Sequence, residues 1–242
     1  MTTAATPRPL TGATAVVTGA SRGIGRAIAL RLAAAGADVA LWARDITALQ
    51  AVQSEISTLG ARSQVFVVDV TDSAAIRDAS DVVRSTMAPV SILVNNAGAV
   101  LRKLTIGTTD AEWRRIMAVN LDGTFMVTRA FLTDLTRSGG RVINIASISG
   151  REGTAMLSAY CAAKHGVVGF TRALAEELRA AKVSVNAICP GSVDTAMLRE
   201  GLPGARPDMS PDDIASTALF LATPPPLGAP HALTGACIDV FG

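Results

Sequence analysis

Short runs of β-branched residues alternate with alanine- and leucine-rich stretches along the chain. The short runs are continuously hydrophobic, which is typical of strands buried on both faces of a parallel sheet. Repeated strand–helix units predict a doubly wound α/β sheet with helices on both faces. We expect strands at residues 13–18, 38–42, 64–68, 91–94, 141–146, 183–189 and 236–240, and helices at 24–35, 46–59, 73–87, 110–137, 158–181 and 211–221.

The composition is that of a folded globular protein rather than a disordered one. The 242 residues are 49% hydrophobic, and 22 basic side chains face 20 acidic ones, whereas a disordered chain has few apolar residues and a high net charge. No composition break or repeat divides the chain, so we expect a single domain over 1–242. The basic residues form no cluster, which predicts that the protein does not bind nucleic acid.

The sequence also predicts a cytoplasmic location and no membrane span. The uncharged stretch 214–238 is interrupted by Pro224, Pro225 and Pro226, which a spanning helix would not tolerate. The N-terminus lacks the apolar core of a signal peptide. The three cysteines have no metal-site spacing, and no His, Asp and Glu cluster is visible, so we expect neither disulfides nor a metal.

A glycine-rich turn joins the first expected strand to the first helix, with the sequence TGASRGIG at 18–25. Glycines permit a tight turn and let main-chain N–H groups approach a pyrophosphate at the positive end of the helix. The glycine spacing differs from GxGxxG, but a strand–turn–helix context is where a Rossmann-type dinucleotide site lies. The turn therefore predicts dinucleotide binding, with a purely structural turn as the alternative.

The residues after the second expected strand bear on which dinucleotide binds. An acidic residue there binds the ribose hydroxyls of NAD, whereas an arginine accommodates the 2′-phosphate of NADP. Arg44 stands at that place, and Arg22 lies in the glycine-rich turn. Two guanidinium groups suit a dianionic phosphate in charge and geometry. The pattern favours NADPH/NADP over NADH, although Asp45 could play the NAD role and either arginine could be a solvated surface charge.

The single tyrosine of the chain, Tyr160, precedes Lys164 by four residues, which places both on one helical face. Ser147 ends the preceding strand, where ligands of parallel sheets bind. Reduction of a carbonyl needs a proton donor and hydrogen bonds at its oxygen. A free tyrosine has a pKa of about 10, and an ammonium about 4 Å away supplies roughly 4 kcal/mol, enough to bring that pKa near 7. The alternative is a buried tyrosine with a lysine packed on it.

Asn120 and Gly123 interrupt the long helix expected at 110–137. Both are poor residues for a helix interior, so we expect a local bend with a freed carbonyl. Such a carbonyl could hold a water that leads to Lys164. A surface asparagine on an imperfect helix is the alternative.

Seven short segments occur in a characteristic order: TGASRGIG (18–25), VVDVTD (67–72), NNAG (95–98), VNLDG (119–123), NIASISG (144–150), YCAAK (160–164) and PGSVDT (190–195). In this order they resemble the short-chain dehydrogenase/reductase family over nearly the whole chain. The resemblance implies the strand order 3-2-1-4-5-6-7 and assembly as a homotetramer or homodimer through the helices at 110–137 and 158–181. It also implies a catalytic tetrad of Asn120, Ser147, Tyr160 and Lys164.

The resemblance further implies which residues hold the cofactor. Asp69 and Val70 would contact the adenine, Asn95 would lie along the cofactor, and Lys164 would bind the nicotinamide ribose. Val193 and Thr195 would hold the carboxamide. The full expected set is Gly19, Ser21, Arg22, Gly23, Ile24, Gly25, Arg44, Asp69, Val70, Asn95, Ala97, Gly98, Tyr160, Lys164, Pro190, Gly191, Val193 and Thr195.

Within the family the chain most resembles 3-oxoacyl-thioester (acyl-carrier-protein) reductases, although similar helix sequences occur in hydroxybutyrate dehydrogenases. The expected substrate lid at about 195–210 is short, and the proline-rich connector 223–233 is long for the family. Arg102, Lys103 and Arg151 could meet a carboxylate or a carrier phosphate. Apolar residues expected to line the substrate are Ile148, Met156, Leu157, Met197 and Leu198, with Leu101 and Leu202 beside them.

These observations predict an NADPH-dependent carbonyl reductase that acts on a small-molecule or carrier-bound ketone. One alternative is an NAD-dependent dehydrogenase of a small hydroxy compound. Another is a non-catalytic NADP(H)-binding sensor, which would have no need of Tyr160 beside Lys164. Sugar-nucleotide epimerases usually carry a larger C-terminal substrate region than this chain has.

Overall fold

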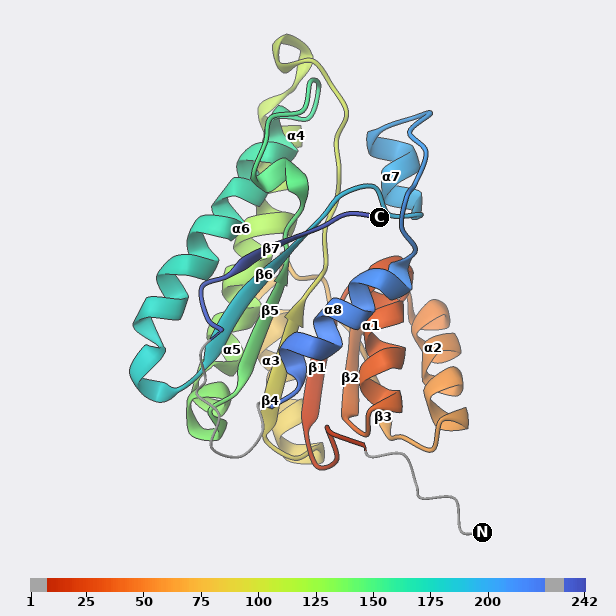
Figure 1. The fold of residues 1–242 in the computed structure, drawn as a ribbon, viewed down its shortest axis with the longest axis vertical. Helices are drawn as coiled ribbons and strands as arrows, with labels where there is room; N and C mark the ends of the chain where they lie inside the picture. Colours follow the sequence, from red (N-terminus) through yellow and green to blue (C-terminus); the bar gives the residue numbers. More distant parts are fainter. Residues whose placement is uncertain (1–7, 225–232) are drawn as a thin grey trace.

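The computed structural model describes residues 8–224 and 233–242 and contains a seven-stranded parallel sheet between two layers of helices (Figure 1). The strand order is β3-β2-β1-β4-β5-β6-β7, so the predicted fold class and strand order are confirmed. The strands are β1 (Thr14–Thr18), β2 (Asp38–Ala43), β3 (Ser63–Val67), β4 (Val90–Asn95), β5 (Arg141–Ile145), β6 (Ser184–Pro190) and β7 (Cys237–Val240).

Alternate residues of each strand face opposite helical layers. Ala15 and Val17 of β1 pack in one apolar cluster with α1, α2 and α8, whereas Val16 packs in another with α3, α5 and α6. Burial on both faces explains why the strand sequences are continuously hydrophobic. The helices are α1 (Gly23–Ala34), α2 (Ile46–Thr58), α3 (Ser73–Thr86), α4 (Asp110–Met117), α5 (Gly123–Ser138), α6 (Ser158–Glu177), α7 (Ala196–Gly201) and α8 (Pro211–Ala222).

The helix expected at 110–137 is divided in the structure. A capping box of Thr109 and Glu112 starts α4, and a π-helical turn at Ala118–Asp122 separates α4 from α5. The turn is centred on Asn120, so the local irregularity predicted there is present. Such π-helical insertions occur often at functional sites.

The sequence also singled out a substrate lid and a proline-rich connector. The lid region 195–210 contains the short helix α7, which begins after Thr195 and lies beyond the carboxyl ends of the strands (Figure 1). Thr195 accepts a hydrogen bond from Leu198 N, which caps α7. Residues 225–232 of the proline-rich connector lie outside the described residues.

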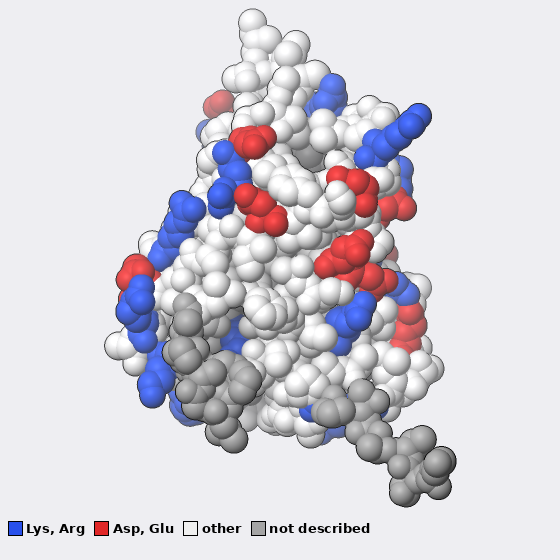
Figure 2. Space-filling view, viewed as in Figure 1, with Lys and Arg blue, Asp and Glu red and all other residues white. Residues whose placement is uncertain are grey.

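None of the helices in the described ranges has the length and apolarity that crossing a bilayer requires. Lys and Arg side chains on the face in Figure 2 are interspersed with Asp and Glu side chains rather than gathered in one large patch. Over the same described residues, no group of three or more His, Cys, Asp and Glu side chains could hold a metal ion.

Candidate active site

The glycine-rich turn lies between β1 and α1 and is fastened to the loop after β4. Gly19 and Gly23 have positive φ angles of 65° and 55°. The Asn96 amide donates to Thr18 O at 3.0 Å and to Gly19 O at 3.2 Å. A Cβ at Gly25 would lie 2.3 Å from both the Asn96 amide nitrogen and Gly19 O. The close packing therefore requires glycine at position 25 and fixes the path of the turn.

Asn96 was not among the cofactor-binding residues expected from the sequence, although its neighbours Asn95, Ala97 and Gly98 were. Besides its side-chain bonds, its main-chain N–H donates to Thr18 Oγ1 at 2.9 Å, and Ala97 N donates to the same oxygen at 3.0 Å. The doubled asparagine after a strand was the available signal. Sequence alone did not tell which of the two amides faces the turn.

The first turn of α1 can bind an anion. Arg22 occupies the N-cap position, and its side chain makes no capping hydrogen bond there. The first N–H groups of a helix lack partners within the helix, and the helix dipole favours negative charge beside them. Thr195 approaches this place from the segment after β6, because a Cβ at Gly23 would lie 3.4 Å from Thr195 Cγ2. The geometry thus fits a dinucleotide pyrophosphate.

The arginine after β2 lies beside an acidic residue that follows β3. The Arg44 side chain is 77% exposed, and its guanidinium lies 3.8 Å from the Asp69 carboxylate. Asp69 accepts hydrogen bonds from Thr71 N at 2.9 Å and Thr71 Oγ1 at 2.7 Å. The main-chain bond from Thr71 lowers the pKa of Asp69 most, and Arg44 adds to that effect. Exposed ion pairs are weak, so Arg44 is available to a ligand.

Asp45 makes a local structural contact. Its carboxylate accepts a hydrogen bond from Ala48 N at 3.0 Å and caps the N-terminus of α2. The cap uses the Oδ1 atom of Asp45; in the alternative, the same side chain would bind the ribose of NAD.

The side chain of Asn95, a residue expected to lie along the cofactor, is turned into the protein interior. Asn95 is buried, and its amide donates to Thr128 Oγ1 and Asn144 Oδ1, each at 2.9 Å. Its Oδ1 has no hydrogen-bond partner among the described residues. Because side chains alternate across a strand, Asn95 points into the interior while Asn96 reaches the glycine-rich turn.

The four expected catalytic residues come from three places around the ends of β4 and β5. Tyr160 and Lys164 lie one turn apart on α6, and the Lys164 ammonium is 5.7 Å from the centre of the Tyr160 ring. Ser147 lies two residues beyond the end of β5 and is close enough to hydrogen-bond with the Tyr160 hydroxyl. Asn120 lies on the π-helical turn. Tyr160, Lys164 and Asn120 are all buried.

The charge state of Tyr160 differs from the sequence-based expectation. Burial raises the pKa of Tyr160 to about 12, and the bond with Ser147 offsets this only in part. Burial also lowers the pKa of Lys164 to about 8. The Lys164 ammonium donates to Ile145 O at 2.7 Å rather than to the tyrosine. The Tyr160 pKa therefore lies above its ordinary value in the protein alone, opposite to the expected lowering, because desolvation outweighs the hydrogen bond with Ser147.

Asn120 is bonded through both its side chain and its main chain. Its amide donates to Ala99 O and to Ile116 O, each at 2.8 Å, and its Oδ1 accepts from Ala99 N at 3.3 Å. These bonds tie the loop after β4 to the π-helical turn. The Asn120 carbonyl accepts a hydrogen bond from Thr124 Oγ1 at 2.9 Å. Because a carbonyl oxygen has two lone pairs, a water can still bind it.

An apolar cluster surrounds Tyr160 and extends to the lid helix. Leu157 is buried in it, and Leu101, Met197 and Leu202 pack against it. Helix α7 lies close to the loop after β4, since a Cβ at Gly201 would be 2.9 Å from Val100 Cγ2. The other expected lining residues, Ile148, Met156 and Leu198, lie outside this cluster, and Met156 has a positive φ of 67°.

Two of the three cations considered for a charged substrate group are already paired. The Lys103 ammonium lies 2.8 Å from the Glu112 carboxylate. Arg151 lies 3.5 Å from Asp239 and donates to Cys237 O at 3.2 Å. Arg102 is exposed, with no carboxylate within 4 Å in the part of the chain that the structure describes.

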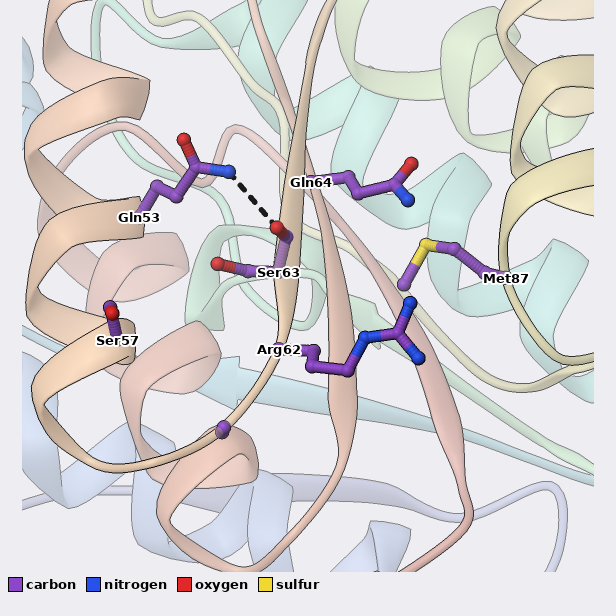
Figure 3. Close-up of a pocket in the computed structure, with 7 residues that line it drawn as sticks. Gln53, Ser57, Arg62, Ser63, Gln64 and Met87 are labelled. Carbon is purple, nitrogen blue, oxygen red and sulfur yellow. Dashed lines mark hydrogen bonds between the residues drawn. The ribbon is translucent and has the colours of Figure 1, made fainter.

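A hollow of about 340 Å³ lies away from these residues, at the start of edge strand β3 (Figure 3). In it the Gln53 amide donates to Ser63 O at 2.9 Å, and Arg62 is 3.7 Å from Asp38. The hollow contains none of the expected site residues. Its lining is Gln53, Ser57, Ala61, Arg62, Ser63, Gln64 and Met87.

The chain is similar to a known protein family and to named relatives over most of its length. The short chain dehydrogenase family model matches residues 13–204. The chain is 36% identical to 3-oxoacyl-[acyl-carrier-protein] reductase of Synechocystis sp. over 96% of this chain and 97% of that protein.

Two solved structures share the fold and carry different cofactors. Carveol dehydrogenase of Mycobacterium avium, in complex with NAD, has a TM-score of 0.88 and 28% identity over 97% of this chain and 98% of that one. A protein of Beutenbergia cavernae, provisionally named an NAD(P)-dependent gluconate 5-dehydrogenase and solved with NADP at low occupancy, has a TM-score of 0.86 and 36% identity over 97% of each chain.

Proposed function

Because the chain belongs to the short-chain dehydrogenase family and is an oxidoreductase of CH–OH and C=O groups, we propose that it is an NADPH-dependent carbonyl reductase. We further propose that its substrate is a 3-oxoacyl thioester or a similar β-keto compound, either free or bound to a carrier. The relatives named as 3-oxoacyl-[acyl-carrier-protein] reductases support this substrate class.

The observation that carries the proposal is the position of Tyr160, one helical turn from Lys164 and within hydrogen-bonding reach of Ser147. NADPH, when bound, supplies the hydride. The Tyr160 hydroxyl donates a proton to the carbonyl oxygen, and Ser147 donates a hydrogen bond to the same oxygen. The Lys164 ammonium stabilises the phenolate that remains after the proton has left.

We propose that the expected cofactor residues hold NADPH so that it reaches from the first turn of α1 to this place. The pyrophosphate would bind at the first turn of α1, next to the segment that ends at Thr195. Ala97 and Gly98 follow β4 on the same side of the sheet, and a Cβ at Gly98 would lie 2.9 Å from Asn120 Oδ1. Asp69 and Val70 would flank the adenine. Further expected contacts are Pro190, the last residue of β6, and Gly191 and Val193, which follow it.

The high pKa of Tyr160 favours the direction of carbonyl reduction, because the hydroxyl stays protonated at neutral pH. We expect the rate of reduction to be constant below about pH 8 and to fall above it, as Lys164, with a pKa of about 8, loses its charge. Oxidation of the alcohol requires the phenolate beside a charged Lys164, a state with one proton fewer than the one that reduces the carbonyl, so its rate rises with pH up to about pH 8 and then levels off. Profiles of kcat/KM in both directions measure this, and a reduction rate that stays constant to pH 10 would contradict it.

We propose that Arg44 and Arg22 bind the 2′-phosphate of NADPH. The exposed guanidinium of Arg44 and the helix-capping role of Asp45 support this choice over NADH. Arg44→Ala is expected to raise the KM for NADPH about 10- to 100-fold, because one charge-assisted contact with the 2′-phosphate is lost. The KM for NADH should stay nearly unchanged, since NADH lacks that phosphate. Arg179→Ala, which removes an exposed arginine paired with Glu176, is the matched control. Equal effects on both cofactors would refute the assignment.

We also propose that the protein acts in the cytoplasm as a homotetramer or homodimer. An aromatic surface on α5 and α6 supports pairing through these helices. Phe125 is 43% exposed, lies edge-on to Phe170 at 6.2 Å, and carries the Arg129 guanidinium 4.9 Å above its ring. Exposed aromatic and arginine side chains are enriched at protein interfaces.

A further inference from the structure

We propose that a chain of buried hydrogen bonds holds the π-helical turn that carries Asn120 in register with α6, so that its members position the catalytic residues. This inference deepens the proposed reductase function. It rests on that function because the expected loss of kcat can be measured only if the protein reduces a carbonyl. We call this set the Thr–Asn chain; its members are Thr124, Thr128, Asn95, Asn144 and Thr171.

The first half of the Thr–Asn chain runs from the π-helical turn along α5 to the end of β4. Thr124 Oγ1 donates to the Asn120 carbonyl at 2.9 Å, and Thr128 Oγ1 donates to the Thr124 carbonyl at 2.7 Å. The Asn95 amide then donates to Thr128 Oγ1 at 2.9 Å. Each hydroxyl hydrogen is used by a main-chain carbonyl, so Thr128 can receive the amide only as an acceptor.

The second half runs from β4 across β5 to α6. The second Asn95 N–H donates to Asn144 Oδ1 at 2.9 Å, and the Asn144 amide donates to Thr171 Oγ1 at 2.9 Å. Thr171 Oγ1 in turn donates to the Val167 carbonyl at 2.8 Å. The Thr–Asn chain thereby links α5 to α6 through side chains of the neighbouring strands β4 and β5.

Helix α6 is attached to β5 at two points on one helical face. Lys164 Nζ donates to the Ile145 carbonyl at 2.7 Å, and Thr171, seven residues later, accepts from Asn144, the neighbour of Ile145. Residues seven apart lie two turns apart on the same face. Two such attachments fix the rotation of α6 about its axis, and that rotation determines where the Tyr160 hydroxyl points.

Burial makes these bonds sensitive to the loss of a single member. No member of the Thr–Asn chain is more than 7% exposed, and Asn144 and Thr171 are fully buried. A buried donor that loses its acceptor is left unpaired in a medium of low dielectric, so the surroundings must rearrange. The nearest routes for rearrangement are a rotation of α6 and a shift of the π-helical turn, and both displace catalytic groups.

The test replaces Thr171 with valine, which has the same shape but no hydroxyl. Thr14→Val is the matched control, because Thr14 is also fully buried and its hydroxyl has no hydrogen-bond partner in the part of the chain that the structure describes. Thr171→Ser restores the acceptor and serves as the rescue. Two readouts are made on all three variants in the full chain: kcat and KM for NADPH with acetoacetyl thioester, and hydrogen–deuterium exchange of the segment 116–124.

For Thr171→Val we expect kcat to fall about 10- to 100-fold, the effect of a small misplacement of catalytic groups, with KM for NADPH nearly unchanged. We also expect faster exchange in the segment 116–124, although it lies on a different helix. Thr171→Ser should recover most of both effects, and Thr14→Val should show neither.

The exchange readout separates this inference from the reductase proposal. If no carbonyl is reduced by the wild type, faster exchange at 116–124 in Thr171→Val still supports the coupling between α6 and the π-helical turn. Unchanged exchange there overturns the inference, whatever the activity. A kcat loss that Thr14→Val matches would also overturn it.

Discussion

Tyr160→Phe is expected to lower kcat for carbonyl reduction by about 10²- to 10⁴-fold, the usual contribution of a positioned general acid. The substitution removes the hydroxyl that donates the proton and keeps the ring, which packs with Leu157 and Ala163 in the apolar cluster. Because the hydroxyl is buried with Ser147 as its partner, its loss changes little else in the site. Steady-state rates with a saturating ketone and NADPH measure the effect.

Two further measurements show whether such a loss is catalytic. The dissociation constant of NADPH, followed by its fluorescence, should stay close to that of the wild type, and so should the melting temperature. A Phe variant that keeps the wild-type rate would exclude Tyr160 as the acid. Tight NADPH binding without turnover by the wild type itself, over a broad set of ketones and alcohols, would favour the sensor alternative.

Gly25→Ala is expected to abolish cofactor binding and to destabilise the fold. The added Cβ would lie 2.3 Å from Gly19 O, a main-chain atom, and 2.3 Å from the Asn96 amide that holds the turn. Overpacking of this kind costs about 1–3 kcal/mol of unfolding free energy. We expect no measurable binding of NADPH at concentrations that saturate the wild type, together with a lower melting temperature.

Gly153→Ala is the matched control for that experiment. Gly153 is exposed, and a Cβ there would meet no atom within 4 Å. It should bind NADPH and melt as the wild type does. If Gly25→Ala also bound NADPH normally, the glycine-rich turn would not be the pyrophosphate site.

The sheet could be predicted from the sequence because its signal is local. Each strand is a short hydrophobic run bounded by turn residues, and the ends of β1 and β2 differ from the expected ones by a single residue. The irregularity at Asn120 was also visible, because Asn and Gly are poor helix residues. In contrast, α7 was missed, since its six residues depend on the Thr195 cap and on packing against Val100.

The parts of the site that were missed depend on burial and on side-chain direction. The spacing of Tyr160 and Lys164 is readable in the sequence, but the desolvation of both groups and the bond from Lys164 to Ile145 are not. Asn96 rather than Asn95 reaches the glycine-rich turn, and this depends on the face of the sheet toward which each side chain points. The capping role of Asp45 was open to prediction, because it directly precedes a helix.

We propose that this chain moves a hydride from NADPH to a carbonyl carbon beside Tyr160. The most direct test uses NADPH that carries deuterium at the transferred position of C4, with acetoacetyl thioester, a β-keto ester and a cyclic ketone as separate substrates. Mass spectrometry of the products measures the label. We predict one deuterium on the carbinol carbon of at least one product with the wild type and almost none with Tyr160→Phe. NADPH binding without labelled product from any of the three substrates would contradict the claim.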